Sequence, residues 1–140
     1  MLTKAEADAI VIESKVITNN ITWRSVPCSS RPRFQFETSV LVPTRNMLLK
    51  LYGRCGGSNY SFSLVCGGQP IRKLTKHARH RNPDQQFITG LHKHIWDEVN
   101  EDGYAYVPDD IHAEDVHQAF HDFLKECSIE LRGAYKAFLV

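Results

Sequence analysis

The chain has 140 residues, of which 42% are hydrophobic and 24% charged, and its formal net charge is +1. This balance excludes collagen-like and low-complexity proteins and predicts one domain over residues 1–140. Charges interrupt the apolar residues near the N-terminus, and no later stretch approaches the ~20 apolar residues of a membrane span. We therefore expect a cytoplasmic protein with no membrane partner. The four cysteines lack a C-x-x-C spacing, which predicts free thiols without a role in a site.

A helix is expected to begin near Thr3. Thr3 and Glu6 have the spacing of a capping box, in which both side chains bond amides at a helix start. The pattern ends at Asn19-Asn20. The apolar stripe of this helix, which should cover a sheet, is predicted to consist of Ala5, Ala9, Ile12 and Val16.

Strands are predicted over residues 21–26, 34–42, 47–52, 60–66 and 71–74. Residues 34–42 show the pattern most clearly, because apolar and polar side chains alternate through them. Glycine-rich connections permit the positive φ angles of tight turns, so neighbouring strands are expected to form an antiparallel meander. The last of these strands is expected to run into a loop over residues 77–90.

Positive charge is concentrated between residues 72 and 93, where Asp84 is the single acid. This density predicts a surface for phosphate or another anion, with RNA as the partner. Residues 95–130 hold eleven acids against Lys125 alone, so the alternative is that the two stretches pair within the molecule. The predicted nucleic-acid-binding residues are Arg72, Lys73, Lys76, Arg79, Arg81 and Lys93.

Four of the seven histidines lie in the same stretch. Residues 91–96 are β-formers, and alternate side chains of a strand face the same way. His92 and His94 are therefore predicted to share one face of the strand. Leu91, Lys93 and Ile95 should lie on the other face. Asn82-Pro83-Asp84 is a turn pattern that would bring His80 back towards this strand.

A second helix is expected over residues 110–127, after a short extended piece at residues 104–107. His117 and His121 are interpreted as part of its solvated face, and the tail after residue 127 is compatible with either helix or strand. The fold class is therefore α+β, a single domain with an antiparallel sheet of about five or six strands, an N-terminal helix and a C-terminal amphipathic helix. The apolar stripe of the second helix is predicted to consist of Val116, Ala119, Phe120, Phe123, Leu124 and Cys127.

The segments His80-Arg81-Asn82-Pro83-Asp84 and Gly90-Leu91-His92-Lys93-His94 resemble the H-x-N-P-D-G and G-P-H-x-H core of a bacterial and phage domain family of unknown function. The resemblance extends over residues 72–129. Gln85 stands where that core has its turn glycine, Leu91 replaces the proline, and Leu74 replaces an aspartate. The core is also distantly similar to TumE-type toxins, which implies a toxin–antitoxin or mobile-element protein that acts on RNA.

Histidines titrate at a pKa of about 6.5, so several of them beside arginines suit cleavage of RNA by 2′-hydroxyl attack. In this hypothesis His92 or His94 is the base, His80 the acid, and Arg72 or Arg81 holds the phosphate. A metal alternative makes His80, His92 and His94 ligands, with Asp84 as a fourth; otherwise no cofactor is expected. The competing class is a non-catalytic binding module, an inhibitor or antitoxin-like protein that holds a protein partner through the acidic helix. The sequence leaves open whether the protein is an enzyme.

Overall fold

The computed structural model describes residues 2–27, 32–101, 103, 105–108 and 115–138. Its described helices are α1 (Lys4–Ile12) and α2 (Val116–Glu126), and a short 3-10 turn, η1 (Pro43–Arg45), joins two of the strands. The described strands are β1 (Lys15–Ile17), β2 (Ile21–Thr22), β3 (Arg24–Val26), β4 (Arg33–Val42), β5 (Met47–Gly56), β6 (Asn59–Cys66), β7 (Gln69–Arg81), β8 (Phe87–Ile95), β9 (Ala105–Tyr106), β10 (Ile129–Leu131) and β11 (Tyr135–Lys136).

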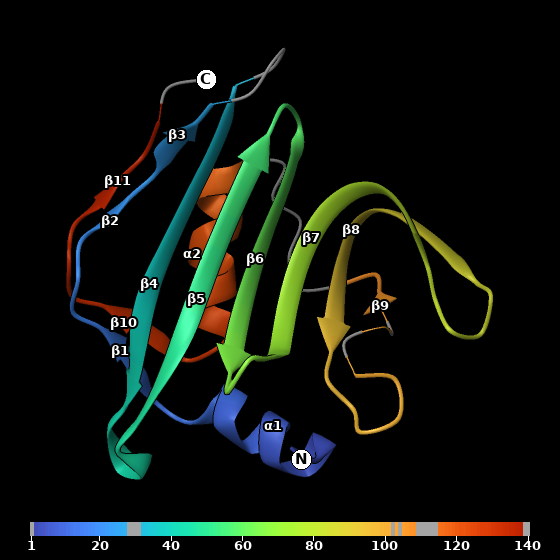
Figure 1. Ribbon diagram of the computed structural model, residues 1–140, viewed down its shortest axis with the longest axis horizontal. Coiled ribbons are helices and arrows are strands. Elements are labelled where there is room, and N and C mark those ends of the chain that lie inside the picture. The colour runs from blue at the N-terminus through green and yellow to red at the C-terminus, as the bar shows by residue number, and fades with distance from the viewer. Residues whose placement is uncertain (1, 28–31, 102, 104, 109–114, 139–140) are drawn as a thin grey trace.

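A long twisted sheet forms the framework of the protein, with α2 behind it and α1 across its lower end (Figure 1). Within the described residues, nine strands form one mixed sheet in the order β10-β1-β4-β5-β6-β7-β8-β9, and β3 pairs with the side of β4. The neighbours from β4 to β9 are antiparallel, whereas β1 and β10 are parallel. Strands β2 and β11 form a separate parallel pair.

This architecture shows that the expected antiparallel sheet of five or six strands was wrong. The parallel pairing of Lys15 with Ile129 joins opposite ends of the chain, and strands of two or three residues are too short to show a periodic pattern. Residues 77–90 were also wrongly expected to be a loop. Instead β7 continues to Arg81 and β8 begins at Phe87, because two long antiparallel neighbours satisfy each other's backbone groups even where the sequence is polar.

Thr3 caps α1 as expected, because its side-chain oxygen accepts a hydrogen bond from the Glu6 amide at 3.1 Å. The buried side of the helix differs from the predicted stripe. It consists of Ala7, Ile10 and Val11, whereas Ile12 is 75% exposed. Both sets have helical spacing, but only the observed one places two adjacent β-branched side chains against the core.

The apolar stripe predicted for α2 is buried from Val116 to Cys127. The described helix begins at Val116, with Asp115 as its N-cap; residues 110–114 of the predicted helix lie outside the described residues. The ring centroids of Phe120 and Phe123 lie 5.6 and 6.1 Å from that of Phe62 on β6. The helix therefore packs against the middle of the sheet.

The tail after α2 adopts the strand alternative. The Tyr135 hydroxyl accepts a hydrogen bond from Trp23 Nε1 and lies 2.6 Å from Nδ1 of His117. Interpreting His117 as a solvated residue was therefore wrong, whereas His121 is exposed. These contacts attach the end of the chain to α2 and to the first part of the sheet.

Lys15 joins the ends of the two helices. Its buried ammonium donates to the carbonyls of Val11, Glu13 and Cys127 at 2.6, 2.7 and 2.5 Å. These carbonyls lie at the C-terminal ends of α1 and α2, where the helix dipole favours a cation. Three acceptors therefore match the three N–H groups of the ammonium.

Among the described thiols, Cys55, Cys66 and Cys127 are free, and Cys28 lies outside the described residues. Burial raises the pKa of Cys127 to about 12, so this thiol stays protonated at neutral pH. None of the helices in the described part of the chain is long and apolar enough to cross a membrane.

Candidate nucleic-acid interface

The two faces of the sheet differ in chemistry. Alternate side chains of β4, β5 and β6 point towards α2 and are buried, as Phe36, Leu51 and Phe62 illustrate. The intervening side chains point to the opposite side, which no described helix covers. We call this side of β4 to β8 the open face. Polar residues occupy most of its positions. This uncovered face is therefore the candidate binding surface of the protein.

Two rows of side chains cross the open face from strand to strand. Antiparallel neighbours in register lie side by side, so each row is read directly from the strand pairing. The first row is Gln35, Arg54, Ser61, Thr75 and His92, and the second is Glu37, Tyr52, Ser63, Lys73 and His94. Both histidines therefore stand at the ends of rows that contain a cation and hydroxyl groups.

His92 and His94 share a face, as expected from the period of a strand. Their ring centroids lie 5.0 Å apart, and the side chains are only 1% and 6% exposed. Nδ1 of His92 lies 3.0 Å from the Gly90 carbonyl, which can only accept a hydrogen bond. This contact favours the neutral tautomer that carries its proton on Nδ1.

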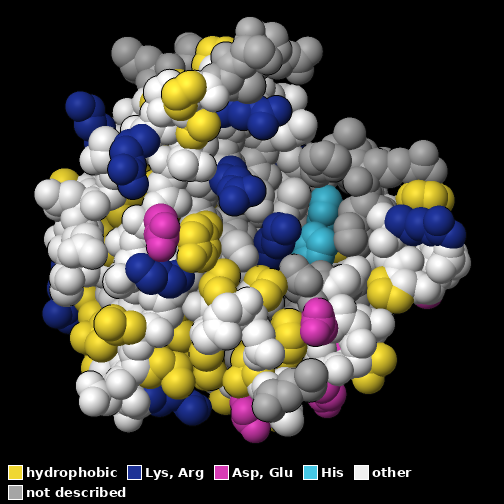
Figure 2. All heavy atoms as spheres, in the orientation of Figure 1, with side chains coloured by type: hydrophobic (Ala, Val, Ile, Leu, Met, Phe, Trp, Pro, Cys, Tyr) yellow, Lys and Arg dark blue, Asp and Glu magenta, His cyan; other side chains and the backbone are white. Residues whose placement is uncertain are grey.

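The open face is positively charged. Its described strand positions carry Arg33, Lys50, Arg54 and Lys73 against Glu37, whose carboxylate lies 3.3 Å from the Lys50 ammonium. Figure 2 shows lysine and arginine side chains spread over this face, with histidine side chains among them near β7 and β8. This potential favours a polyanion.

Arg72 and Lys93 lie on the other face, away from His92 and His94. Their cationic groups lie 2.7 and 2.6 Å from the two carboxylate oxygens of Glu126 on α2, and Arg72 also lies 3.5 Å from Asp8 on α1. The predicted pairing of basic and acidic stretches is confirmed for these residues. They connect the sheet to both helices.

Asn82 in the turn motif has a structural partner. Its side-chain amide donates to the Ala105 carbonyl and accepts from the Ala105 amide, both at 2.7 Å. Asp84 Oδ1 accepts from the Gln86 amide at 3.0 Å, which is a turn contact. The Arg81 guanidinium lies 5.8 Å from the Phe87 ring across the β7–β8 pair. The side chains of Arg79 and His80 lie outside the described part of the structure.

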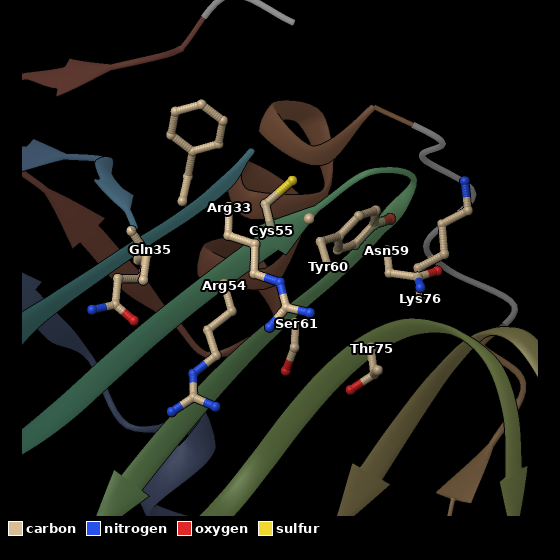
Figure 3. Close-up of a pocket in the computed structure, with 12 residues that line it drawn as sticks. Arg33, Gln35, Arg54, Cys55, Asn59, Tyr60, Ser61, Thr75 and Lys76 are labelled. Atoms are coloured by element: carbon tan, nitrogen blue, oxygen red, sulfur yellow. The ribbon is translucent and has the colours of Figure 1, made fainter. Parts of the chain in front are cut away.

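A pocket of about 530 Å³ opens beside the first row. Figure 3 shows Arg33 extending over the sheet towards Ser61, Arg54 extending away from Ser61 and Thr75, and Gln35 at one side. Among the described lining residues, Lys76 is the one that was predicted to bind nucleic acid. Sequence reasoning missed Arg33, Arg54 and Ser61, although the alternation of polar and apolar residues in their strands indicated that they face outward.

The amino-acid sequence matches the model of a known protein family. A model described as a family of unknown function, DUF6978, matches residues 2–129. The chain belongs to this family. No curated protein and no solved structure matches it. The expected membership of a domain family of unknown function is confirmed at this level, and the likeness to TumE-type toxins stays a hypothesis.

The matched region of this DUF6978 protein contains every strand of the open face, both central histidines and α2. Strand β11 and Phe138 lie beyond it. The candidate interface is therefore part of the family domain.

Proposed function

We propose that the open face of this DUF6978 protein binds single-stranded RNA. The observation that carries the proposal is the pair of cross-strand rows, which place cations, hydroxyl groups and Tyr52 on one uncovered sheet face. Arginine and lysine side chains can follow the phosphates, and an aromatic ring offers a surface on which a base can stack. Single strands are favoured over duplexes because only unpaired bases can stack on a sheet in this way.

We further propose that the histidine pair cleaves the bound RNA by 2′-hydroxyl attack. One imidazole would take the hydroxyl proton and the other would protonate the leaving oxygen, which suits two rings 5.0 Å apart. Lys73 is the register partner of His94 and would stabilise the charge on the phosphate, the role first expected of Arg72. The resemblance of the histidine motifs to TumE-type toxins supports a toxin–antitoxin or mobile-element protein.

Binding is tested by fluorescence anisotropy with a labelled single-stranded RNA of mixed sequence over a series of salt concentrations. Tyr52→Ala should weaken binding about tenfold, because stacking contributes roughly 1–3 kcal/mol per base, and should leave the salt dependence unchanged. Lys125→Gln is the matched control, because Lys125 is an exposed cation on α2. If both variants bind like the wild type, the open face is not the RNA site.

Cleavage is tested on the same RNA with purified wild-type protein and with His94→Asn, whose fold is checked by its thermal transition. Loss of cleavage by a factor of about 10²–10⁴ with retained binding would support the proton-transfer role. Unchanged cleavage would exclude it, and inhibition by a chelator would instead favour the metal alternative. Absence of both cleavage and salt-sensitive binding would favour the non-catalytic module with a protein partner.

A further inference from the structure

The described lining of the pocket beside the first row carries positive charge and no carboxylates. Arg33, Arg54 and Lys76 contribute positive charge, and none of the described residues that line the pocket is an aspartate or glutamate. Within the described residues, no carboxylate forms an ion pair with Arg33 or Arg54. Two guanidinium groups are therefore available to an anion that enters.

Ser61 and Thr75 add two hydroxyl groups to the pocket that the arginines line. Ser61 and Thr75 are adjacent in the first row, and Figure 3 shows the Arg33 side chain extending towards Ser61. Oγ1 of Thr75 is buried and has no hydrogen-bond partner among the described residues. A rotation of the Thr75 side chain that turned this hydroxyl into the pocket would let a ligand oxygen bond it, which favours binding because an unpaired buried polar group is costly.

Gly56 positions the Arg33 side chain. The two residues are register partners, and a Cβ atom added to Gly56 would lie 3.3 Å from Cγ of Arg33. The missing side chain therefore lets the stem of Arg33 lie close across β5. The side chain extends over the sheet towards Ser61, and the residue as a whole is exposed.

We infer that this pocket binds the phosphate monoester at one end of an RNA chain, an inference that rests on the proposed function. A monoester carries about −1.5 to −2 charges at pH 7 and three strong acceptor oxygens, whereas a linkage inside the chain carries one charge. Two arginines with planar donor forks and two hydroxyl groups match the monoester better. A volume of about 530 Å³ lies in the range of small-ligand sites. Thr75 is the register partner of His92, so the terminal nucleotide would lie beside the histidine pair.

The test compares one RNA sequence in three forms that end in a 5′-phosphate, a 3′-phosphate or hydroxyl groups only. We expect one phosphate form to bind about tenfold more tightly than the hydroxyl form, the effect of a charge-assisted bond, and its identity reports which end is held. Arg33→Gln and Thr75→Val should each reduce this preference. Lys50→Gln should preserve it while weakening all three forms, because Lys50 lies on the open face but outside the pocket lining.

Equal binding of the three forms would overturn the inference and leave the proposed RNA-binding function standing. If no RNA binds, calorimetry with nucleoside 5′- and 3′-monophosphates, against nucleosides as controls, decides the pocket separately. Binding of a monophosphate that is lost in Arg33→Gln would retain the phosphate site and overturn RNA as its carrier. If no monophosphate binds either, both the phosphate site and the proposed RNA-binding function are overturned.

Discussion

At the residue scale, Glu126 is the acceptor of two cations that the sheet presents to α2. Arg72 and Lys93 lie within 2.7 Å of its carboxylate oxygens, and all three side chains are largely buried. Such a group need not stabilise the fold relative to an apolar cluster, but removing one member leaves unpaired charge in the interior. The network therefore makes each member sensitive to substitution.

Glu126→Ala is expected to lower the free energy of unfolding by about 3–5 kcal/mol, the cost of breaking a buried pair. Chemical denaturation measures it. Glu130→Ala is the matched control, because Glu130 pairs with Arg132 at the surface, where such pairs contribute about 0–1 kcal/mol. Equal small losses in both variants would show that the Glu126 network is not buried in solution.

Lys15 should make stability depend on alkaline pH. Burial lowers the pKa of this ammonium from 10.5 to about 8. Between these values the unfolded chain binds a proton that the folded chain lacks, so this residue's contribution to the free energy of unfolding rises with pH. Below the folded pKa the contribution is constant at its lower value.

The test compares wild-type protein with Lys15→Met, because other buried groups titrate in the same range. Burial raises the pKa of Tyr135 to about 12, for example, but that effect is common to both proteins. The stability of the wild type relative to the variant should increase from pH 8 to pH 10.5. A flat difference across that window would show that Lys15 keeps an ordinary pKa when folded.

Gln85 occupies a backbone conformation that suits glycine. Its φ angle is +72° in the turn between β7 and β8, where an ordinary side chain costs about 1–2 kcal/mol. Gln85→Gly is therefore expected to raise the free energy of unfolding by about 1 kcal/mol. Gln86→Gly, one residue further along, has no positive φ to relieve and should not stabilise. Thermal unfolding of both variants checks this, and destabilisation by Gln85→Gly would contradict it.

At the element scale, the edge strand β9 is held by a side chain as well as by its neighbour β8. Asn82 bonds both backbone groups of Ala105, which explains why an asparagine in a turn motif is buried. Asn82→Ala should cost about 1–3 kcal/mol, because it leaves both buried groups unpaired. Hydrogen exchange at the Ala105 amide should accelerate, whereas exchange at Leu51 in the middle of the sheet should follow global unfolding. Unchanged exchange at Ala105 would contradict the assigned role.

Elements with long periodic patterns could be predicted from the sequence, and those fixed by distant partners could not. The stripe of α2 and the alternation in β4 are local properties, so their buried positions were correctly identified. In α1 two stripes compete, and the packing partner selects one. The pairing of β1 with β10 depends on residues at opposite ends of the chain. Such contacts leave almost no local pattern in two or three residues.

At the scale of the whole molecule, closeness in sequence did not mean closeness in space. Arg72 and Lys73 are neighbours in the chain, but strand alternation directs one towards α2 and the other to the open face. The histidine pair could be predicted because it depends on one strand alone. Arg54 and Ser61 could not be placed beside Thr75, because that contact needs the register of three strands.

This division of charge leads to a prediction with two readouts. Lys73 and Lys93 lie on opposite faces of neighbouring strands, the first on the open face and the second paired with Glu126. Lys73→Gln should weaken RNA binding and reduce the salt slope by about 0.7, the value for one lost contact with a single strand. Its free energy of unfolding should change by less than about 0.5 kcal/mol, as for other surface substitutions.

Lys93→Gln should give the reverse result. It should lower the free energy of unfolding by roughly 3–5 kcal/mol, because it removes one partner of a buried ion pair. The RNA salt slope of the folded fraction should stay as in the wild type, since Lys93 faces α2. Salt titrations of anisotropy and urea denaturation of both variants supply the four values. A salt slope that is reduced in Lys93→Gln and unchanged in Lys73→Gln would mean that RNA contacts the helix-covered side. The open face would then lose its assignment as the RNA site.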